Sequence, residues 1–270
     1  MKINWFPGHM NKALKDIADQ LKKVDVVLYL LDARIPVSSL NPSLNSLTEN
    51  KPVLYVFNKI DMADEERVKE LLPQFRTENS DYVLFNSTLS GKTDVILSKI
   101  KKLASKKIEK YKAKGVKATI RTMVVGIPNC GKSTLVNNLS KKAKAVTGNK
   151  AGVTKHGLWL PVGDCIEIYD TPGTLYPNIS DQEVAKKLAY VGSVRDEILD
   201  FNELSSELLK LLDKLYPEEL NRRYNGAKSA HDIALARKYV ISGGDVDDDR
   251  AARGVIDDFR KGRIGRLTLD

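Results

Sequence analysis

The sequence has few cysteines and no long apolar run. Only two of its 270 residues are cysteines, Cys130 and Cys165, and neither has a partner at CxxC spacing. This excludes a zinc knuckle and a disulfide framework. No apolar stretch approaches the roughly 18 to 20 residues of a membrane span, and no signal region follows the first five residues. We therefore expect a cytoplasmic protein that makes no membrane contact.

What the sequence has instead is an excess of positive charge. Its 44 Lys and Arg residues outnumber 35 Asp and Glu residues, which gives a formal net charge of +9. Such an excess of positive charge is typical of a protein that binds a polyanion. The basic residues gather in three clusters, at residues 99–117, 141–150 and 260–266. These clusters could position a phosphate backbone without reading its sequence, although a solvated helix face explains the first one equally well.

Apolar runs without alternation indicate a parallel sheet that is covered on both faces. Residues 24–31, 53–57 and 82–85 are such runs, and further strands are predicted at residues 120–125, 158–162 and 165–169, which makes six in all. The last two flank Gly163-Asp164, a two-residue hairpin turn. Helical spacing is found at residues 13–23, 64–75 and 95–112, and later at 181–191, 204–215, 230–240 and 247–261. The sequence predicts an α/β fold, with a doubly wound, mostly parallel six-stranded sheet in residues 1–177 and a small all-α domain in residues 178–270.

The strongest local signal is the segment GIPNCGKS at residues 126–133, which lies between a predicted strand and a predicted helix. Its glycines let backbone N–H groups converge on phosphate oxygens. Lys132 would reach the β- and γ-phosphates, and Ser133 would coordinate Mg²⁺. The predicted phosphate-binding residues are Asn129, Cys130, Gly131, Lys132, Ser133 and Thr134. A glycine turn with a chance lysine is the alternative, and the flanking strand and helix argue against it.

The tetrapeptide NKID at residues 58–61 follows a predicted strand and points to guanine. Asp61 can accept hydrogen bonds from the ring N1–H and the exocyclic amine, whereas adenine offers no such donor pair. Lys59 can lie along the base, and Asn58 can hold the loop. The predicted guanine-site residues are Asn58, Lys59, Ile60, Asp61, Asn86 and Ser87. Taken alone, the tetrapeptide also fits a strand followed by an Asp helix cap.

Two switch motifs follow the phosphate loop in sequence. In DTPG, at residues 170–173, Asp170 would hold Mg²⁺ and Gly173 would donate its N–H to the γ-phosphate. Thr154 would complete the metal shell only when GTP is bound. Contacts of this kind make a nucleotide-dependent switch.

The order of the motifs, with NKID before GIPNCGKS and DTPG after it, resembles that of the circularly permuted GTPases. Among them, NWFPGHM at residues 4–10 and GRIGR at residues 262–266 resemble the ribosome biogenesis GTPase A family, over essentially the whole chain. The resemblance implies a GTPase that binds GTP and GDP and acts on the precursor of the large ribosomal subunit. Its partners would be rRNA and ribosomal proteins, its role late maturation, and it would be a monomer off the ribosome. A GTP-dependent switch that binds a protein partner without a ribosomal role is the alternative.

Circular permutation changes the connectivity of the sheet and not its architecture. The chain now runs from the DTPG motif directly into the predicted helical domain. We therefore hypothesise that permutation ties the γ-phosphate sensor to that domain, so that the bound nucleotide reorients the residues after Pro177.

The group that activates water is the least determined part of the predicted site. A glutamine follows the DxxG motif in Ras-like GTPases, whereas Thr174 stands there in this sequence. The family's N-terminal motif favours His9 instead, with simple packing of the N-terminus as the alternative. Lys132 and Gly173 are the other residues expected to act on the transferred phosphate. By resemblance, Asn129 indicates K⁺ beside the phosphates, where a cation could replace an arginine finger, and loop capping is the alternative.

Overall fold

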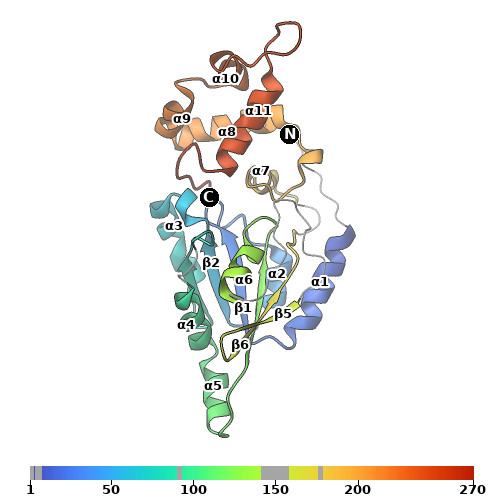
Figure 1. The fold of residues 1–270 in the computed structure, drawn as a ribbon, viewed down its shortest axis with the longest axis vertical. Coiled ribbons are helices and arrows are strands. Elements are labelled where there is room, and N and C mark those ends of the chain that lie inside the picture. Colours follow the sequence, from blue (N-terminus) through green and yellow to red (C-terminus); the bar gives the residue numbers. More distant parts are fainter. Residues whose placement is uncertain (1–2, 4–7, 90–92, 141–157, 176–178) are drawn as a thin grey trace.

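The fold is built around a single six-stranded sheet. A computed structural model describes residue 3 and residues 8–89, 93–140, 158–175 and 179–270. The strand order is β3-β2-β1-β4-β6-β5 (Figure 1). The strands are β1 (Val26–Asp32), β2 (Val53–Asn58), β3 (Ser80–Leu84), β4 (Ile120–Gly126), β5 (Leu158–Val162) and β6 (Ile166–Asp170). Every neighbouring pair is parallel except β5 and β6, so the predicted mostly parallel sheet is confirmed.

Helices cover both faces of the sheet, and the side chains of β1 alternate between the two resulting cores. Val26, Leu28 and Leu30 share one core with α4 (Asp94–Leu103) and α6 (Lys132–Ser140). The intervening residues of β1 share the other core with α1 (Gly8–Leu21), α2 (Pro42–Thr48) and α3 (Glu65–Leu71). Every residue of β1 is therefore buried, which explains why its sequence is a continuous apolar run.

Several helices differ in extent from the sequence-based prediction. The predicted helix at residues 95–112 divides at Ala104 into α4 and α5 (Ser105–Lys112). Two further helices were not predicted, α2 and α9 (Pro217–Tyr224), and both begin with proline. Proline is favourable at the first helical position because that N–H group has no partner inside the helix. At α2 the Asn41 side chain also caps the helix, by accepting a hydrogen bond from the Ser43 N–H at 3.0 Å.

Beyond the sheet, the described residues 179–270 are mainly helical, as predicted, and we call them the helical portion. It forms α7 (Gln182–Tyr190), α8 (Phe201–Leu215), α9, α10 (Ala230–Ala236) and α11 (Asp248–Arg260), and α8 packs against α11 (Figure 1). The helix predicted at residues 230–240 ends early, because the chain turns back after Lys238 and Val240 forms a β-bridge with Val246. None of the described helices has the length and apolar character needed to cross a membrane.

The last residues of the chain return to the sheet. The Leu267 N–H donates to the Met62 carbonyl at 3.0 Å, and the Leu269 N–H donates to the Arg34 carbonyl at 2.7 Å. Both leucines are buried. The chain end thus lies beside the carboxyl ends of β1 and β2 and anchors the helical portion there, as the C label in Figure 1 shows.

Truncation of Leu269 should weaken this anchor. We expect Leu269→Ala to lower the free energy of unfolding by about 2 to 4 kcal/mol, because a buried leucine loses its contacts and leaves a cavity. Leu235→Ala is the control, since Leu235 is 53% exposed on α10 and should change stability by less than about 0.5 kcal/mol. Urea unfolding of both variants checks this, and equal effects would contradict the anchoring role.

Candidate functional site

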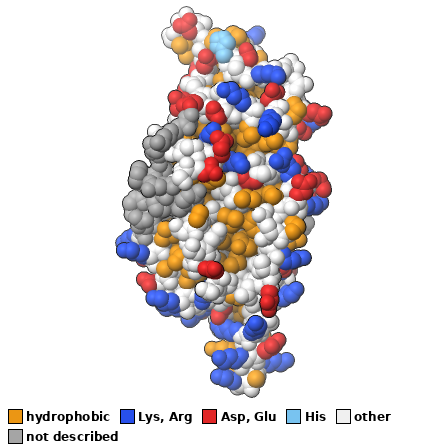
Figure 2. Space-filling view, turned by 180° about the vertical axis from the view of Figure 1, so that it is seen from behind, with side chains coloured by type: hydrophobic (Ala, Val, Ile, Leu, Met, Phe, Trp, Pro, Cys, Tyr) orange, Lys and Arg blue, Asp and Glu red, His pale blue; other side chains and the backbone are white. Residues whose placement is uncertain are grey.

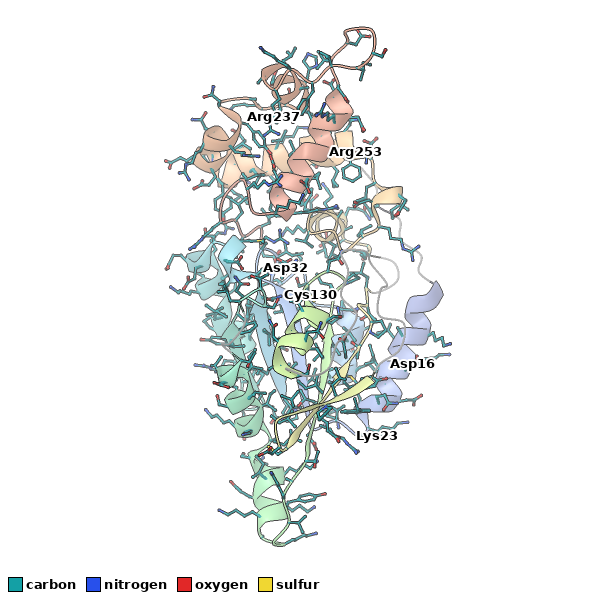
Figure 3. All side chains as sticks on the ribbon, in the orientation of Figure 1. Asp16, Lys23, Asp32, Cys130, Arg237 and Arg253 are labelled. Carbon is teal, nitrogen blue, oxygen red and sulfur yellow. The ribbon has the colours of Figure 1, made fainter. Side chains whose placement is uncertain are left out.

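The predicted motifs converge at one edge of the sheet. β1, β2, β4 and β6 end there at Asp32, Asn58, Gly126 and Asp170. Figure 3 shows Asp32 and Cys130 close together at this edge. In open α/β sheets the carboxyl ends of the strands form the ligand crevice. The structure therefore brings the NKID, phosphate-loop and DTPG segments into a single site.

The phosphate loop leads from β4 into α6 and depends on its glycines. Gly126 and Gly131 have φ angles of 150° and 100°. A Cβ atom would collide with a β1 carbonyl at Gly126 and with the Asn58 amide at Gly131, so only glycine fits. Lys132 is buried, and its Nζ donates to the carbonyl oxygens of Gly126 at 3.1 Å and Ile127 at 2.7 Å. Its ammonium group thus lies within the loop.

Asn58 joins three segments of the site. Its Nδ2 donates to the Ser87 Oγ at 3.0 Å and to the Cys130 carbonyl at 2.7 Å. Its Oδ1 accepts from the Ser87 N–H at 2.9 Å. Asn86, next to Ser87, accepts from the Thr88 N–H at 2.8 Å and shapes the same loop. These bonds hold the end of β2 against the phosphate loop and against the loop that follows β3.

The other residues of NKID lie at the surface of this edge. Lys59 has a left-handed backbone with φ of 62°, and Ile60 and Asp61 begin a short 3-10 helix. The Lys59 Nζ donates to the Asp32 Oδ2 at 2.9 Å and to the Asn129 carbonyl at 2.7 Å. Asp61 is exposed, and its carboxylate has no hydrogen-bond partner among the described residues.

Asp32 and Arg34 were missed in the sequence, although they follow the apolar run of β1 at the ligand edge. Both are buried, and the Arg34 Nε and Nη2 donate to the two Asp32 carboxylate oxygens at 2.9 and 2.7 Å. Burial by itself raises the pKa of Asp32, but the charges of Arg34 and Lys59 outweigh burial and hold that pKa well below its usual range. We call Asp32, Arg34 and Lys59 the Asp32 cluster.

The Asp32 cluster also reaches the helical portion. The Arg34 Nη1 donates to the carbonyl oxygens of Phe259 at 3.0 Å and Arg260 at 3.2 Å, at the end of α11. The Phe259 carbonyl also accepts from the Gly262 N–H at 3.1 Å, and the guanidinium supplies a further donor at this helix end, where carbonyl groups run out of partners within the helix. Arg34 therefore joins β1 to α11 through a buried contact.

Ser133 and Asp170 form a pair that suits a divalent cation. The Ser133 Oγ donates to the Asp170 Oδ2 at 3.1 Å, and the Asp170 Oδ1 is buried and has no hydrogen-bond partner among the residues that the structure describes. Burial raises the pKa of Asp170. A buried carboxylate oxygen with no partner, next to a hydroxyl, fits the oxygen ligands that Mg²⁺ prefers. Thr134 follows half-buried in α6, and Thr154, the third predicted ligand, lies outside the described residues.

The end of the DTPG motif lies against the phosphate loop. The Thr174 N–H donates to the Gly126 carbonyl at 3.2 Å. A Cβ atom on Gly173 would lie 2.7 Å from the Pro128 Cα and 3.0 Å from the Lys132 Nζ, so this contact requires glycine. Thr174 is fully buried. His9 lies in the first turn of α1, and its side chain lies outside the described part of the structure.

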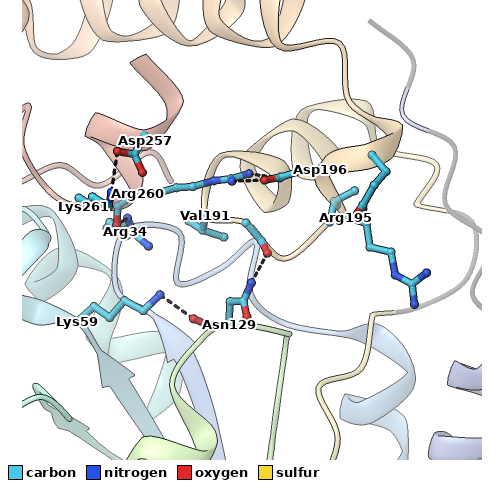
Figure 4. Close-up of a pocket in the computed structure, with 12 residues that line it drawn as sticks. Arg34, Lys59, Asn129, Val191, Arg195, Asp196, Asp257, Arg260 and Lys261 are labelled. Atoms are coloured by element: carbon cyan, nitrogen blue, oxygen red, sulfur yellow. Dashed lines mark hydrogen bonds and ion pairs between the residues drawn. The ribbon is translucent and has the colours of Figure 1, made fainter. Parts of the chain in front are cut away.

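A second connection joins the phosphate loop to the helical portion. The Asn129 Nδ2 donates to the Gly192 carbonyl, and the Ser193 Oγ donates to the Pro128 carbonyl at 2.8 Å. A cavity of about 640 Å³ opens beside these contacts, with Lys59, Asn129 and Arg260 among its lining residues (Figure 4). In this arrangement the Asn129 amide nitrogen binds Gly192, and K⁺ at this residue stays a prediction.

The phosphate loop after β4, NKID after β2 and DTPG after β6 define a phosphate-loop GTPase whose motifs are circularly permuted. Residues 121–232 match the family model described as "50S ribosome-binding GTPase". "Ribosome biogenesis GTPase A" of Priestia megaterium is 40% identical over 280 residues, which cover 100% of this chain and 97% of that protein. The Bacillus cereus protein of the same name is 38% identical over 278 residues, covering 100% of this chain and 94% of that protein. This chain belongs to the ribosome biogenesis GTPase A family and hydrolyses GTP.

More distant relatives agree with this assignment. The crystal structure of GNP-bound YlqF from T. maritima is 25% identical, has a TM-score of 0.70, and covers 96% of this chain and 97% of that one. "Mitochondrial ribosome-associated GTPase 1" of Xenopus tropicalis is 30% identical over 294 residues, covering 99% of this chain and 94% of that protein. The resemblance predicted from the motifs is therefore confirmed.

Removal of the Asp32 charge should destabilise the protein in a pH-dependent way. We expect Asp32→Asn to lower the free energy of unfolding at pH 7 by roughly 3 kcal/mol, because Arg34 and Lys59 lose their counter-charge. Since the folded-state pKa of Asp32 is depressed, its contribution is complete above the unfolded pKa of about 3.9 and is lost as the pH falls further.

The difference in free energy of unfolding between the unmodified protein and Asp32→Asn should therefore become smaller below about pH 4. Asp19→Asn is the control, because Asp19 is exposed and its one ion pair among the described residues is with exposed Lys22. Urea unfolding at several pH values checks the prediction. A constant difference down to pH 3 would contradict it.

Proposed function

We propose that this GTPase binds the precursor of the large ribosomal subunit in the cytoplasm and promotes its late maturation. The observation that carries the proposal is full-length similarity to proteins named ribosome biogenesis GTPase A. The net charge of +9 supports rRNA as a partner beside ribosomal proteins. GTP hydrolysis then releases the factor, which is a monomer when it is off the ribosome.

In this proposal the NKID edge selects guanine. Asp61 accepts the two N–H donors of the base, and its lack of an internal partner supports that role. Lys59 lies along the base, with Ile60 completing the motif. Asn58 holds the loop after β3 and the phosphate loop in fixed positions, as its bonds to Ser87 and Cys130 support.

The phosphate loop and the DTPG motif act on the phosphates. Ser133 and Asp170 would hold Mg²⁺, with Thr154 as a further ligand, and the ion would neutralise charge on the phosphate oxygens. Lys132 and Gly173, which lie side by side, would both stabilise the transferred phosphate. His9 would orient the attacking water, and Asn129 would hold K⁺ once it is free of Gly192.

The competing function is a GTP-dependent switch that binds a protein partner without a ribosomal role. Stimulation of GTP hydrolysis by purified large-subunit precursors distinguishes the two. We expect at least roughly tenfold stimulation, lost as the salt concentration rises, since phosphate contacts release counterions. Purified small subunits are the control. Equal rates with and without large-subunit precursors would overturn the ribosomal proposal and favour the protein-partner switch.

Substitution of Asp170 should separate stability from function. We expect Asp170→Asn to reduce Mg²⁺-dependent GTP affinity at least tenfold, yet to raise the free energy of unfolding without Mg²⁺ at pH 7 by about 1 kcal/mol. The gain arises because a buried charge with an unpartnered oxygen is removed. Because burial raises the folded-state pKa of Asp170, the gain should vanish as the pH falls to the unfolded value of about 3.9.

Nucleotide titrations and urea unfolding measure the two effects. Asp164→Asn, in the exposed turn between β5 and β6, is the matched control and should change neither quantity. Unchanged GTP affinity in Asp170→Asn would remove Asp170 from the metal site.

A further inference from the structure

One segment carries nearly all of the excess charge of the chain. Residues 99–117 contain nine lysines and one glutamate, in a protein of net charge +9. The segment comprises the end of α4, all of α5 and the link to β4. In Figure 1 α5 projects beyond the sheet, away from the helical portion, and Figure 2 shows lysine and arginine side chains gathered at that end. We call residues 99–117 the lysine arm.

Most of this charge is not neutralised within the described part of the chain. Lys99, Lys107 and Lys117 pair with Asp81, Asp25 and Asp164. The lysines without an ion pair among the described residues are Lys101, Lys102, Lys106, Lys110, Lys112 and Lys114, and all six are exposed. A solvated helix face normally balances its charges with acidic residues three or four positions away. The lysine arm instead presents a concentrated positive field.

The basic cluster at residues 260–266 is different, because most of its charges are paired internally. Arg260 binds Asp196 at 2.8 Å, and Lys261 binds Asp257 at 2.8 Å. Arg263 also binds Asp257 at 3.2 Å, so Arg266 is the one member of this cluster that is exposed without an ion pair among the described residues, against six such lysines on the arm.

An apolar cleft of about 510 Å³ lies beside these lysines. Its lining residues are Lys101, Ile108, Lys112, Gly115, Val116, Lys117, Ala118, Ile120 and Cys165. Val116 is 55% exposed, and Tyr111 nearby is 37% exposed. Ile120 begins β4 and Cys165 immediately precedes β6, so the cleft lies at the opposite edge of the sheet from the phosphate loop.

We propose that the lysine arm binds unpaired RNA, with its lysines on successive phosphates and one splayed base in the apolar cleft. A linear polyanion matches a row of free lysines, and the cleft has the volume of a small-ligand pocket. Unpaired bases leave the stack and bind apolar or aromatic surfaces, whereas a duplex keeps its bases inside. This proposal rests on the proposed function in one respect, namely that RNA is a partner of the protein.

An acidic peptide with apolar side chains is the competing occupant of the cleft. The charge favours RNA, because only two of the six unpaired lysines line the cleft and the other four lie outside its lining. A peptide bound in the cleft would leave most of these charges unmatched.

The charge contribution is tested with a fluorescent single-stranded RNA of 12 nucleotides and an RNA duplex of equal length, using fluorescence anisotropy. We expect the unmodified protein to prefer the single strand. Lys101→Glu combined with Lys112→Glu should weaken binding roughly tenfold or more. Each lost phosphate contact should also reduce the slope of log affinity against log salt concentration by about 0.7.

The matched control reverses two exposed lysines of α1, Lys12→Glu with Lys15→Glu, and should change affinity less than about twofold. Both double variants should retain intrinsic GTP hydrolysis, because neither lies at the nucleotide edge. Equal losses in the two double variants would overturn the assignment to the arm.

The base contribution is tested with the same strand carrying abasic sites. The unmodified protein should bind it roughly tenfold more weakly than the intact strand, whereas Val116→Asp should bind both strands equally weakly. Equal affinity for intact and abasic RNA, or for single strand and duplex, would overturn base insertion. If an acidic Glu-Leu peptide displaces the labelled RNA at a lower concentration than unlabelled RNA does, the result would favour a protein partner. Since these assays use isolated RNA, they can succeed even if large subunits fail to stimulate hydrolysis.

Discussion

The buried carboxylate of Asp32 holds together two parts of the molecule that have different tasks. It neutralises Arg34, which binds the end of α11, and Lys59, which binds the phosphate loop through the Asn129 carbonyl. A buried cation without its counter-charge is strongly destabilising, so neither contact is available without Asp32. β1, the phosphate loop and the helical portion therefore share one electrostatic centre.

Circular permutation gives this centre its importance. β1 and β2 precede the phosphate loop in sequence, and the Asp32 cluster at their carboxyl ends lies where the chain end returns and α11 docks. The sequence-based hypothesis placed the coupling between nucleotide and helical domain in the residues that follow DTPG, of which residues 176–178 lie outside the described part. The bonds from Asn129 to Gly192 and from Ser193 to Pro128 provide a further connection in space. A nucleotide contact at the Asn129 side chain would compete with its bond to Gly192. A nucleotide contact at Lys59 would compete with its bonds to Asp32 and to the Asn129 carbonyl.

The strands and motifs could be predicted because local sequence determines them. β1 is apolar up to its last residue, Asp32, since both of its faces are buried, and GIPNCGKS needs glycine where the backbone demands it. The Asp32 cluster could not be predicted in the same way, because Arg34 finds the Phe259 carbonyl 225 residues later in the chain. The lysine arm was visible as composition, but its cleft depends on Cys165, which only the fold brings near Val116. The short helices α2 and α9 were not predicted, although each begins with proline, a residue that is favourable at a helix start.

The central claim is that the nucleotide site and the helical portion form one coupled unit. Spin labels on Glu70→Cys in α3 and Leu235→Cys in α10, in a Cys165→Ser background, report the distance between the two parts; both label positions are exposed and Cys130 is buried. Electron-electron resonance with GDP and with a non-hydrolysable GTP analogue measures that distance in each state. The coupled account predicts two different distance distributions, and identical distributions in the two states would contradict it.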